Sequence, residues 1–106
     1  GRLPFWLAPL QVSVATIISD VDDYAKEIIS LLEEAGIRCH ADLRNEKISY
    51  KVREHSSAKV PVIMALGQRE KDNRTVSIRR IGSDKTETMD LKEALKILSI
   101  ENSNPK

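Results

Sequence analysis

Cysteine, aromatic residues and long apolar runs are all scarce in this sequence. Cys39 is the single cysteine among 106 residues, which excludes an internal disulfide and fits a reducing, cytoplasmic setting. Apolar runs reach only five or six residues, whereas a membrane-spanning helix needs about 20. Glycine and proline, four of each, fall singly at junctions and form no linker. We therefore expect one continuous domain that does not enter a membrane.

The chain does contain charge, and the distribution of this charge is more informative than its sum. Lysine and arginine number 17 against 16 acidic residues, and the net charge of +1 does not by itself indicate nucleic-acid binding. Residues 18–37 hold six acids and one base, whereas residues 38–59 and 68–85 each hold six bases and three acids. A solvated surface and a binding face explain such segregation equally well.

The hydrophobic pattern alternates between strand-like and helix-like segments. Residues 12–18 are short and β-branched, as in a buried strand, and the apolar residues after Ser19 and Asp20 recur at helical spacing until Gly36. The pattern further predicts strands over residues 37–43, 62–66, 75–79 and 86–89. It predicts one helix over residues 48–59 and another that begins at the capping-box motif of residues 90–93. Residues 68–74 are expected to form a polar connection.

This order of elements predicts an α/β fold, a mixed sheet with helices on its faces. In such sheets, ligands bind beyond the carboxyl ends of the parallel strands. Two of the connections that leave those ends, residues 42–45 and 67–70, are basic and rich in amide groups. The helix over residues 48–59 has only a thin apolar stripe, made of Ile48, Val52 and Ala58, so most of its surface faces water or a partner.

Catalytic, metal-binding and phosphate-binding motifs find little support. Cys39 and His40 are adjacent in a predicted strand, so their side chains point to opposite faces and cannot act as nucleophile and base. His40 and His55 lack the spacing of zinc ligands. The glycines are isolated, whereas phosphate loops group them between a strand and a helix. We expect no catalytic residue, metal site or cofactor site in this chain.

The remaining signal is a set of planar hydrogen-bonding side chains in the basic segments. Such groups read the edges of unpaired bases, while lysines hold the phosphates. Glu70 could accept from the two edge donors of a guanine, and Arg79 could donate a fork to base acceptors. The alternative is that both are surface residues paired across a hairpin. The candidate RNA-binding residues are Asn45, Lys47, Arg53, Glu70 and Arg79, with Arg44 and Tyr50, which could stack on a base, as weaker candidates.

A resemblance to a known family rests on motifs spread over almost the whole chain. Residues 42–55 read D-L-R-N-E-K-I-S-Y-K-V-R-E-H, and they are followed by K-V-P at 59–61 and by Gly67 and Glu70. Together with the opening P-F-W-L at 4–7, these motifs resemble the C-terminal anticodon-binding domain of bacterial-type threonyl-tRNA synthetases, which are class II enzymes. Related modules occur in prolyl-, histidyl- and glycyl-tRNA synthetases.

The resemblance implies a three-layer, five-stranded sheet with three helices that docks the anticodon loop of threonine tRNA. Positions that match Asn45 and Arg53 would lie at or near the anticodon, and Glu70 and Arg79 would engage the guanine and uracil of its second and third letters. The turn at residues 72–74 lacks the glycine often seen there, which affects the shape of this loop.

The resemblance also implies a division of the chain. Residues 1–9 would be the junction from a catalytic domain that is absent here, residues 10–100 the anticodon-binding domain, and residues 101–106 a frayed tail. ATP, Mg²⁺, threonine and the zinc that selects it would belong to that catalytic domain. The fragment alone would therefore be non-catalytic. The parent enzyme would be a homodimer and the fragment a monomer.

Two other hypotheses remain open at this point. A non-catalytic accessory or protein-interaction module, like the accessory subunit of the mitochondrial polymerase, would keep the sheet and abandon base reading. Such a module has no reason to retain Glu70 and Arg79 together. A small hydrolase that uses Cys39 or His55 is the weaker alternative.

Overall fold

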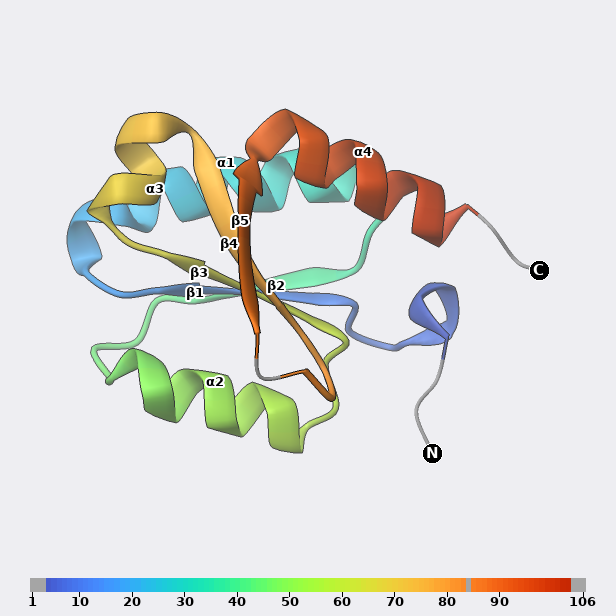
Figure 1. The fold of residues 1–106 in the computed structure, drawn as a ribbon, viewed down its shortest axis with the longest axis horizontal. Helices are drawn as coiled ribbons and strands as arrows, with labels where there is room; N and C mark the ends of the chain where they lie inside the picture. The colour runs from blue at the N-terminus through green and yellow to red at the C-terminus, as the bar shows by residue number, and fades with distance from the viewer. Residues whose placement is uncertain (1–3, 84, 104–106) are drawn as a thin grey trace.

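A five-stranded sheet forms the centre of the domain. The computed structural model describes residues 4–83 and 85–103. The strands are β1 (Val12–Thr16), β2 (Cys39–Asp42), β3 (Val62–Leu66), β4 (Thr75–Arg80) and β5 (Thr86–Asp90). They lie in the order β2-β1-β3-β4-β5, in which β1 is parallel to β2 and β3, β4 is antiparallel to β3, and β5 is antiparallel to β4 (Figure 1). The mixed five-stranded sheet predicted from the sequence is confirmed.

Helices cover the two faces of the sheet unequally. The α-helices are α1 (Asp22–Glu34), α2 (Ile48–Ser57), α3 (Gln68–Asn73) and α4 (Leu91–Asn102), with short 3₁₀ turns η1 (Phe5–Leu7) and η2 (Ser19–Val21). Figure 1 shows α1, α3 and α4 on one side of the sheet and α2 alone on the other. The result is three layers, as expected, with the α2 side less covered than the other.

Side-chain alternation along the strands divides the sheet into a core face and an α2 face. Val14 pairs with Met64, Met64 pairs with Ile78, and all three side chains belong to the buried core that includes residues of α1 and α4. In the neighbouring row, Ile63 pairs with Arg79, so both side chains lie on the opposite face. Most of the large apolar residues of the sheet thus pack on one side, whereas the less covered α2 face carries Ile63 together with polar groups such as Arg79.

Helix α2 packs differently from its predicted apolar stripe. Ile48 and Val52 are half-buried, as expected, but Ala58 lies after the helix and is exposed, so its place in the stripe is wrong. The side chains that the helix buries are those of Lys51 and His55. Burial of these polar groups is tolerated because both find hydrogen-bond partners at the end of β2.

Helix α3 corrects the predicted count of three helices, since four α-helices occur in the described part of the chain. Residues 68–74 were expected to be a polar connection, and α3 indeed buries no residue, so it leaves no apolar periodicity to detect. Its first turn is closed by Glu70, whose Oε1 accepts the backbone N–H of Gly67 at 2.7 Å. Arg74 ends the helix at φ 55°, the left-handed position that glycine commonly takes.

The last helix extends further than predicted. Helix α4 runs to Asn102, two residues into the segment expected to be frayed, and an ion pair of 2.6 Å joins Glu101 to Arg80 on β4. Asp90 stands at the N-cap as expected, but its side chain makes no capping hydrogen bond. Residues 1–3 and 104–106 of the predicted junction and tail lie outside the described residues. Among the described helices, none combines the length and apolarity needed to cross a membrane.

Candidate nucleic-acid interface

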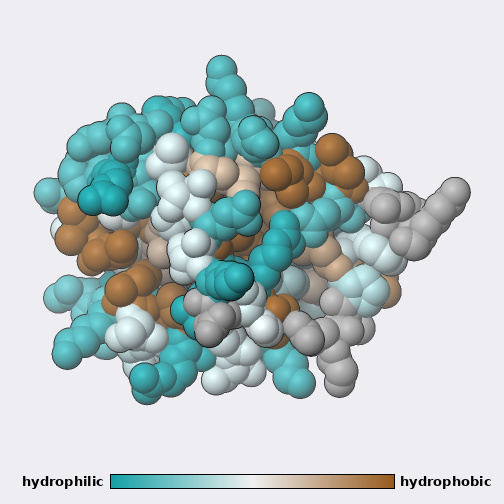
Figure 2. All heavy atoms as spheres, in the orientation of Figure 1, coloured by the Kyte–Doolittle hydropathy of each residue, from teal (hydrophilic) through white to brown (hydrophobic). Residues whose placement is uncertain are grey.

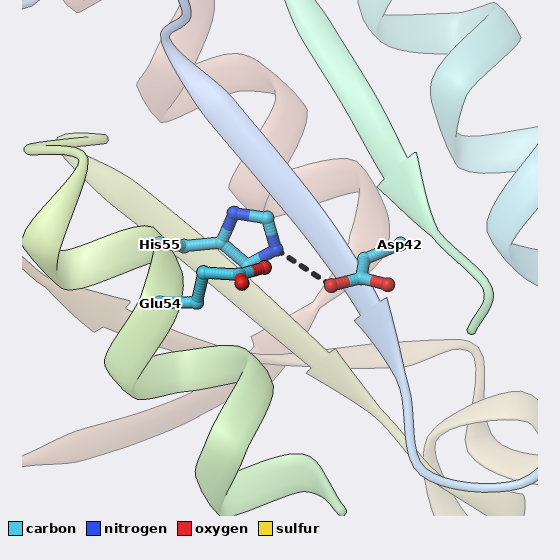
Figure 3. Close-up of side chains that lie close together, drawn as sticks. All are labelled: Asp42, Glu54 and His55. Carbon is cyan, nitrogen blue, oxygen red and sulfur yellow. Dashed lines mark hydrogen bonds and ion pairs between the residues drawn. The ribbon is translucent and has the colours of Figure 1, made fainter. Parts of the chain in front are cut away.

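The motif at residues 42–55 folds into a polar network at the carboxyl end of β2. Asp42 is 2% exposed, and its carboxylate accepts hydrogen bonds from Arg44 Nε at 2.8 Å and Nη2 at 2.7 Å. His55 Nε2, reaching from α2, lies 2.8 Å from Asp42 Oδ2 (Figure 3). Arg44 also pairs with Glu54 on α2. The network therefore fastens the β2–α2 connection to the helix that follows it.

Charge pairing stabilises the ionised forms in this network. Hydrogen bonding from Arg44 holds the pKa of Asp42 well below its usual range, although burial acts in the opposite direction. The same contact raises the pKa of Arg44. Asp42, Glu54 and His55 offer ligand atoms within 4.8 Å of one another, a spacing that suits a metal ion. Because the Arg44 guanidinium already bridges both carboxylates, the cluster has a structural role.

Lys51 supports the same end of the sheet from inside. Its ammonium group is buried and donates to the backbone carbonyls of Thr16 at 2.8 Å and Asp42 at 3.1 Å. Burial lowers the pKa of Lys51. One side chain thus joins the carboxyl ends of β1 and β2. The sequence analysis missed this residue, although its spacing of three from Ile48 and four from His55 places it on the inward side of a helix.

A groove opens between α2 and the α2 face of the sheet. Its volume is about 650 Å³, and Ile48 and Val52 of α2 and Ile63 of β3 provide apolar walls. Arg53 of α2 and Arg79 of β4 also line the groove. The groove therefore offers apolar surface to the faces of bases and guanidinium groups to their edges or phosphates.

Glu70 approaches this groove from its β4 side. Its Oε2 accepts a hydrogen bond of 3.2 Å from the Ser77 hydroxyl, and Ser77 lines the groove two residues before Arg79 on the same strand face. Glu70 Oε1 is held by the N–H of Gly67. A Cβ at Gly67 would lie 3.1 Å from that oxygen, so glycine there permits the carboxylate to approach the backbone closely.

The other candidate residues lie around the start of α2. Asn45 lines a second hollow, of about 360 Å³, beyond the ends of β1 and β2, and Ile17 lines both this hollow and the groove. Lys47 is exposed at the N-cap of α2. Tyr50 donates to Glu54 at 3.1 Å, and the Arg44 guanidinium lies 5.7 Å from the centre of its ring. Arg44 and Tyr50 are thus engaged within the protein.

The surface near the second hollow combines apolar and hydrophilic side chains. Figure 2 shows hydrophobic side chains gathered at the left end of the molecule, where Figure 1 places the connections that leave β1, β2 and β3. Ile17 and Ile18, which follow β1, are 47% and 41% exposed. Aliphatic contact is therefore available beside the polar residues of the β2–α2 connection.

The geometry of Cys39 and His40 agrees with the expectation that they cannot cooperate. Cys39 Sγ lies 3.7 Å from the Ile29 carbonyl of α1, whereas the His40 ring is 6.4 Å from the His55 ring of α2. Their side chains therefore lie on opposite faces of the sheet. Burial raises the pKa of the Cys39 thiol to about 11, which disfavours the thiolate.

These features define a class of protein. A sequence model of the family described as "Anticodon binding domain" matches residues 11–101. The chain belongs to this anticodon-binding-domain family. The match includes every residue of the groove and of the Asp42 network.

Relatives within the family are threonine--tRNA ligases. The chain is 58% identical over 105 residues to the enzyme of Parvibaculum lavamentivorans and 55% identical over 105 residues to that of Dinoroseobacter shibae. In both comparisons 99% of this chain is matched, but only 16% of the relative, so the chain spans about one sixth of these proteins. The resemblance to the anticodon-binding domain of threonyl-tRNA synthetases is confirmed.

Solved structures agree with this assignment. The RNA-binding domain of threonyl-tRNA synthetase from Cryptosporidium parvum Iowa II superimposes with a TM-score of 0.91 at 26% identity, covering 98% of this chain and 26% of that one. Prolyl-tRNA synthetase from Cryptosporidium parvum shares the fold, with a TM-score of 0.82 at 22% identity over 95% of this chain and 23% of that one.

Proposed function

We propose that this domain binds the anticodon loop of threonine tRNA as part of a longer threonine--tRNA ligase, which attaches threonine to that tRNA in an ATP-dependent reaction. The observation that carries the proposal is the row formed by Arg79, Ser77 and the Glu70 carboxylate beside the groove. Family membership supports an anticodon loop as the ligand. The similarity to threonine--tRNA ligases supports threonine tRNA.

Base reading follows from the hydrogen-bonding capacity of this row. Arg79 has donors only, and it suits the oxygen acceptors of a uracil. Each Glu70 oxygen has two lone pairs, of which the Gly67 N–H and the Ser77 hydroxyl use one apiece, so both oxygens can still accept from the two donors on the edge of a guanine. The second and third anticodon letters, guanine and uracil, are therefore assigned to Glu70 and Arg79.

Positioning of the loop falls to residues on and before α2. Arg53 lines the groove and Lys47 is exposed at the N-cap of α2, and both side chains can neutralise phosphates. Asn45, in the second hollow, can offer its amide to an unpaired base of the loop. The apolar wall of Ile48 and Val52 receives base faces by van der Waals contact, which explains how the groove works without an aromatic platform among its lining residues.

The remaining functions belong to the rest of the proposed parent enzyme. ATP, Mg²⁺ and the zinc that selects threonine would bind in its catalytic domain. The parent would act as a cytoplasmic homodimer held together through the catalytic domain, and the isolated domain would be a monomer that carries out no chemistry.

Titration with anticodon stem-loops tests the proposal. The 106-residue chain is mixed with a labelled stem-loop of threonine tRNA, and with a second stem-loop in which the second and third anticodon letters are exchanged. Fluorescence anisotropy should give a Kd at least about tenfold lower for the correct loop, because each lost base contact costs roughly 1–3 kcal/mol. Equal affinities would overturn base reading by Glu70 and Arg79. No binding to either loop would favour an accessory module.

A further inference from the structure

The segment that precedes β1 is fastened to the domain by a buried glutamine. Gln11 is 0% exposed, although its side chain is polar. Its Nε2 donates to the Phe5 carbonyl at 2.9 Å and to Asn102 Oδ1 at 2.8 Å, and its Oε1 accepts the backbone N–H of Arg38 at 2.8 Å. One amide group therefore connects the η1 turn, the end of α4 and the start of β2.

Arg38 fastens the same segment from the surface. Its guanidinium donates to the carbonyl of Ala8 through Nε at 3.0 Å and Nη2 at 2.8 Å, and to the carbonyl of Trp6 through Nη2 at 2.9 Å. Asn102 completes the arrangement by donating to the Gly36 carbonyl at 3.2 Å. Because one guanidinium donates hydrogen bonds to two carbonyls of this short segment, it fixes the path of the backbone there as well as holding the segment against the domain.

Apolar contact adds to these hydrogen bonds. Phe5 is half-buried and packs against the hydrophobic core, and η1 lies against α4. Residues 4–10 are thus a packed part of the domain, and they do not have the composition of a flexible Gly/Ser linker. In the proposed parent enzyme, this segment joins the domain to the catalytic domain, so its path sets the direction of the connection.

We propose that Gln11 and Arg38 are positioning residues that hold the incoming chain in one direction, and thereby fix the orientation of the anticodon groove relative to the catalytic domain. The inference rests on the proposed function. Neither residue lines the groove. A fixed orientation matters because the acceptor end of a tRNA reaches the catalytic site only when its anticodon is held in the right place, and a displacement of 1 Å can reduce a rate about 100-fold.

The test separates anticodon binding from charging in the full-length ligase that contains this domain. Arg38→Ala and Gln11→Leu are compared with the wild type in three assays: the Kd of the anticodon stem-loop, kcat/KM for charging full-length tRNA, and ATP-dependent activation of threonine without tRNA. We expect both variants to lower kcat/KM about tenfold or more while they change the stem-loop Kd and the activation rate less than twofold. Arg38→Lys, which keeps the charge but not the fork, should resemble Arg38→Ala.

Three outcomes would overturn the inference. If kcat/KM for charging by the Arg38→Ala variant stays within twofold of the wild type, the hydrogen bonds from Arg38 to the carbonyls of Trp6 and Ala8 are dispensable. A stem-loop Kd that rises as much as kcat/KM falls would show that the residues only support the fold of the groove. Full rescue by Arg38→Lys would show that the charge matters and the fork does not. Failure of the proposed function would be distinct, because the wild-type ligase itself would then not distinguish the stem-loops.

Discussion

Two adjacent arginines on β4 show how strand geometry separates a candidate binding group from a structural one. Arg79 pairs with Ile63 across the sheet and lines the groove. Arg80 points to the other face and forms an ion pair of 2.6 Å with Glu101 of α4. The sequence alone does not tell which of two neighbouring arginines faces the groove, whereas the register of β4 with β3 does tell it.

Substitution of each arginine should therefore have a different effect. We expect Arg79→Ala to weaken binding of the anticodon stem-loop by about 1–3 kcal/mol, the usual contribution of a bidentate base contact. Arg80→Ala should change binding by less than about 0.5 kcal/mol, because the Arg80 guanidinium is held in a surface ion pair with Glu101 of α4 and does not line the groove. Fluorescence anisotropy at constant salt measures both. Equal losses would mean that the arginines act only through their charge.

The buried carboxylate of Asp42 makes stability depend on pH. Because its pKa is lower in the folded protein than in the unfolded chain, its ionised form stabilises the fold. This contribution is fully present above the unfolded pKa of about 3.9 and is lost as the pH falls from there toward the folded pKa. The fold should therefore weaken in acid partly through this residue.

Asp42→Asn tests this linkage. At pH 7 the substitution should lower the free energy of unfolding by about 3 kcal/mol, because it leaves Arg44 and His55 without their shared partner. Urea denaturation at several pH values should show the difference from wild type shrinking between about pH 4 and pH 2. Glu34→Gln, at an exposed site on α1, should stay within about 0.5 kcal/mol throughout. A difference independent of pH would contradict the role of the ionised carboxylate.

At the scale of single elements, α2 and the connection before it offer less positive charge to the groove than their sequence contains. Lys51 of this helix is buried, and Arg44 before it is paired with two carboxylates, which leaves Lys47 and Arg53 for phosphates. A count of bases over residues 38–59 thus overstates the charge that RNA would meet. The salt dependence of binding should be correspondingly shallow.

Lys47→Ala should reduce this salt dependence in a measurable way. We expect the slope of log K against log salt to become shallower by about 0.7, the value for one phosphate contact to a single strand. Lys26→Ala is the matched control, because Lys26 is an exposed lysine on α1, across the sheet from α2. Stem-loop titrations at four salt concentrations give both slopes. If Lys47→Ala and Lys26→Ala changed the salt-dependence slope equally, RNA binding would not be confined to the α2 face.

The elements differ in how far their sequences reveal them. The strand β3 and the helix α1 were predictable because burial imposes apolar runs and helical periodicity on their sequences. Helix α3 was not, because it buries nothing and depends on the bond between Glu70 and the Gly67 N–H. The buried side of α2 was predicted incorrectly, because the sequence analysis looked for apolar residues there. Lys51 is polar and yet buried.

At the scale of the molecule, the two sides of the sheet differ in charge and cover. The acid-rich segment 18–37 contains α1, whereas the basic segment 38–59 contains α2 on the opposite face. The candidate residues were predictable by type and by motif, but their grouping was not, because it depends on strand register and on the side of the sheet to which α2 crosses. Arg44 shows this limit, since its guanidinium pairs within the protein.

Binding should therefore perturb one face of the molecule. Titration of the ¹⁵N-labelled chain with the anticodon stem-loop should shift amide resonances of α2, β4 and the connection at residues 43–47. Those of α1 and α4, which lie across the sheet, should move little (Figure 1). Shifts concentrated on α1 and α4 would contradict the assignment of the groove as the RNA-binding site, whereas shifts throughout the chain would indicate a change of the whole fold.

The double engagement of Glu70 constrains how such a domain can diverge. The carboxylate that stands beside the groove also closes the first turn of α3, against a glycine at which a Cβ would lie only 3.1 Å from Glu70 Oε1. Any exchange of this acid would also remove the hydrogen bond that closes the first turn of α3. If the proposed base contacts hold, new tRNA identities should arise first at positions with a single task, such as Arg79 and Asn45, while the acid and its glycine are inherited together.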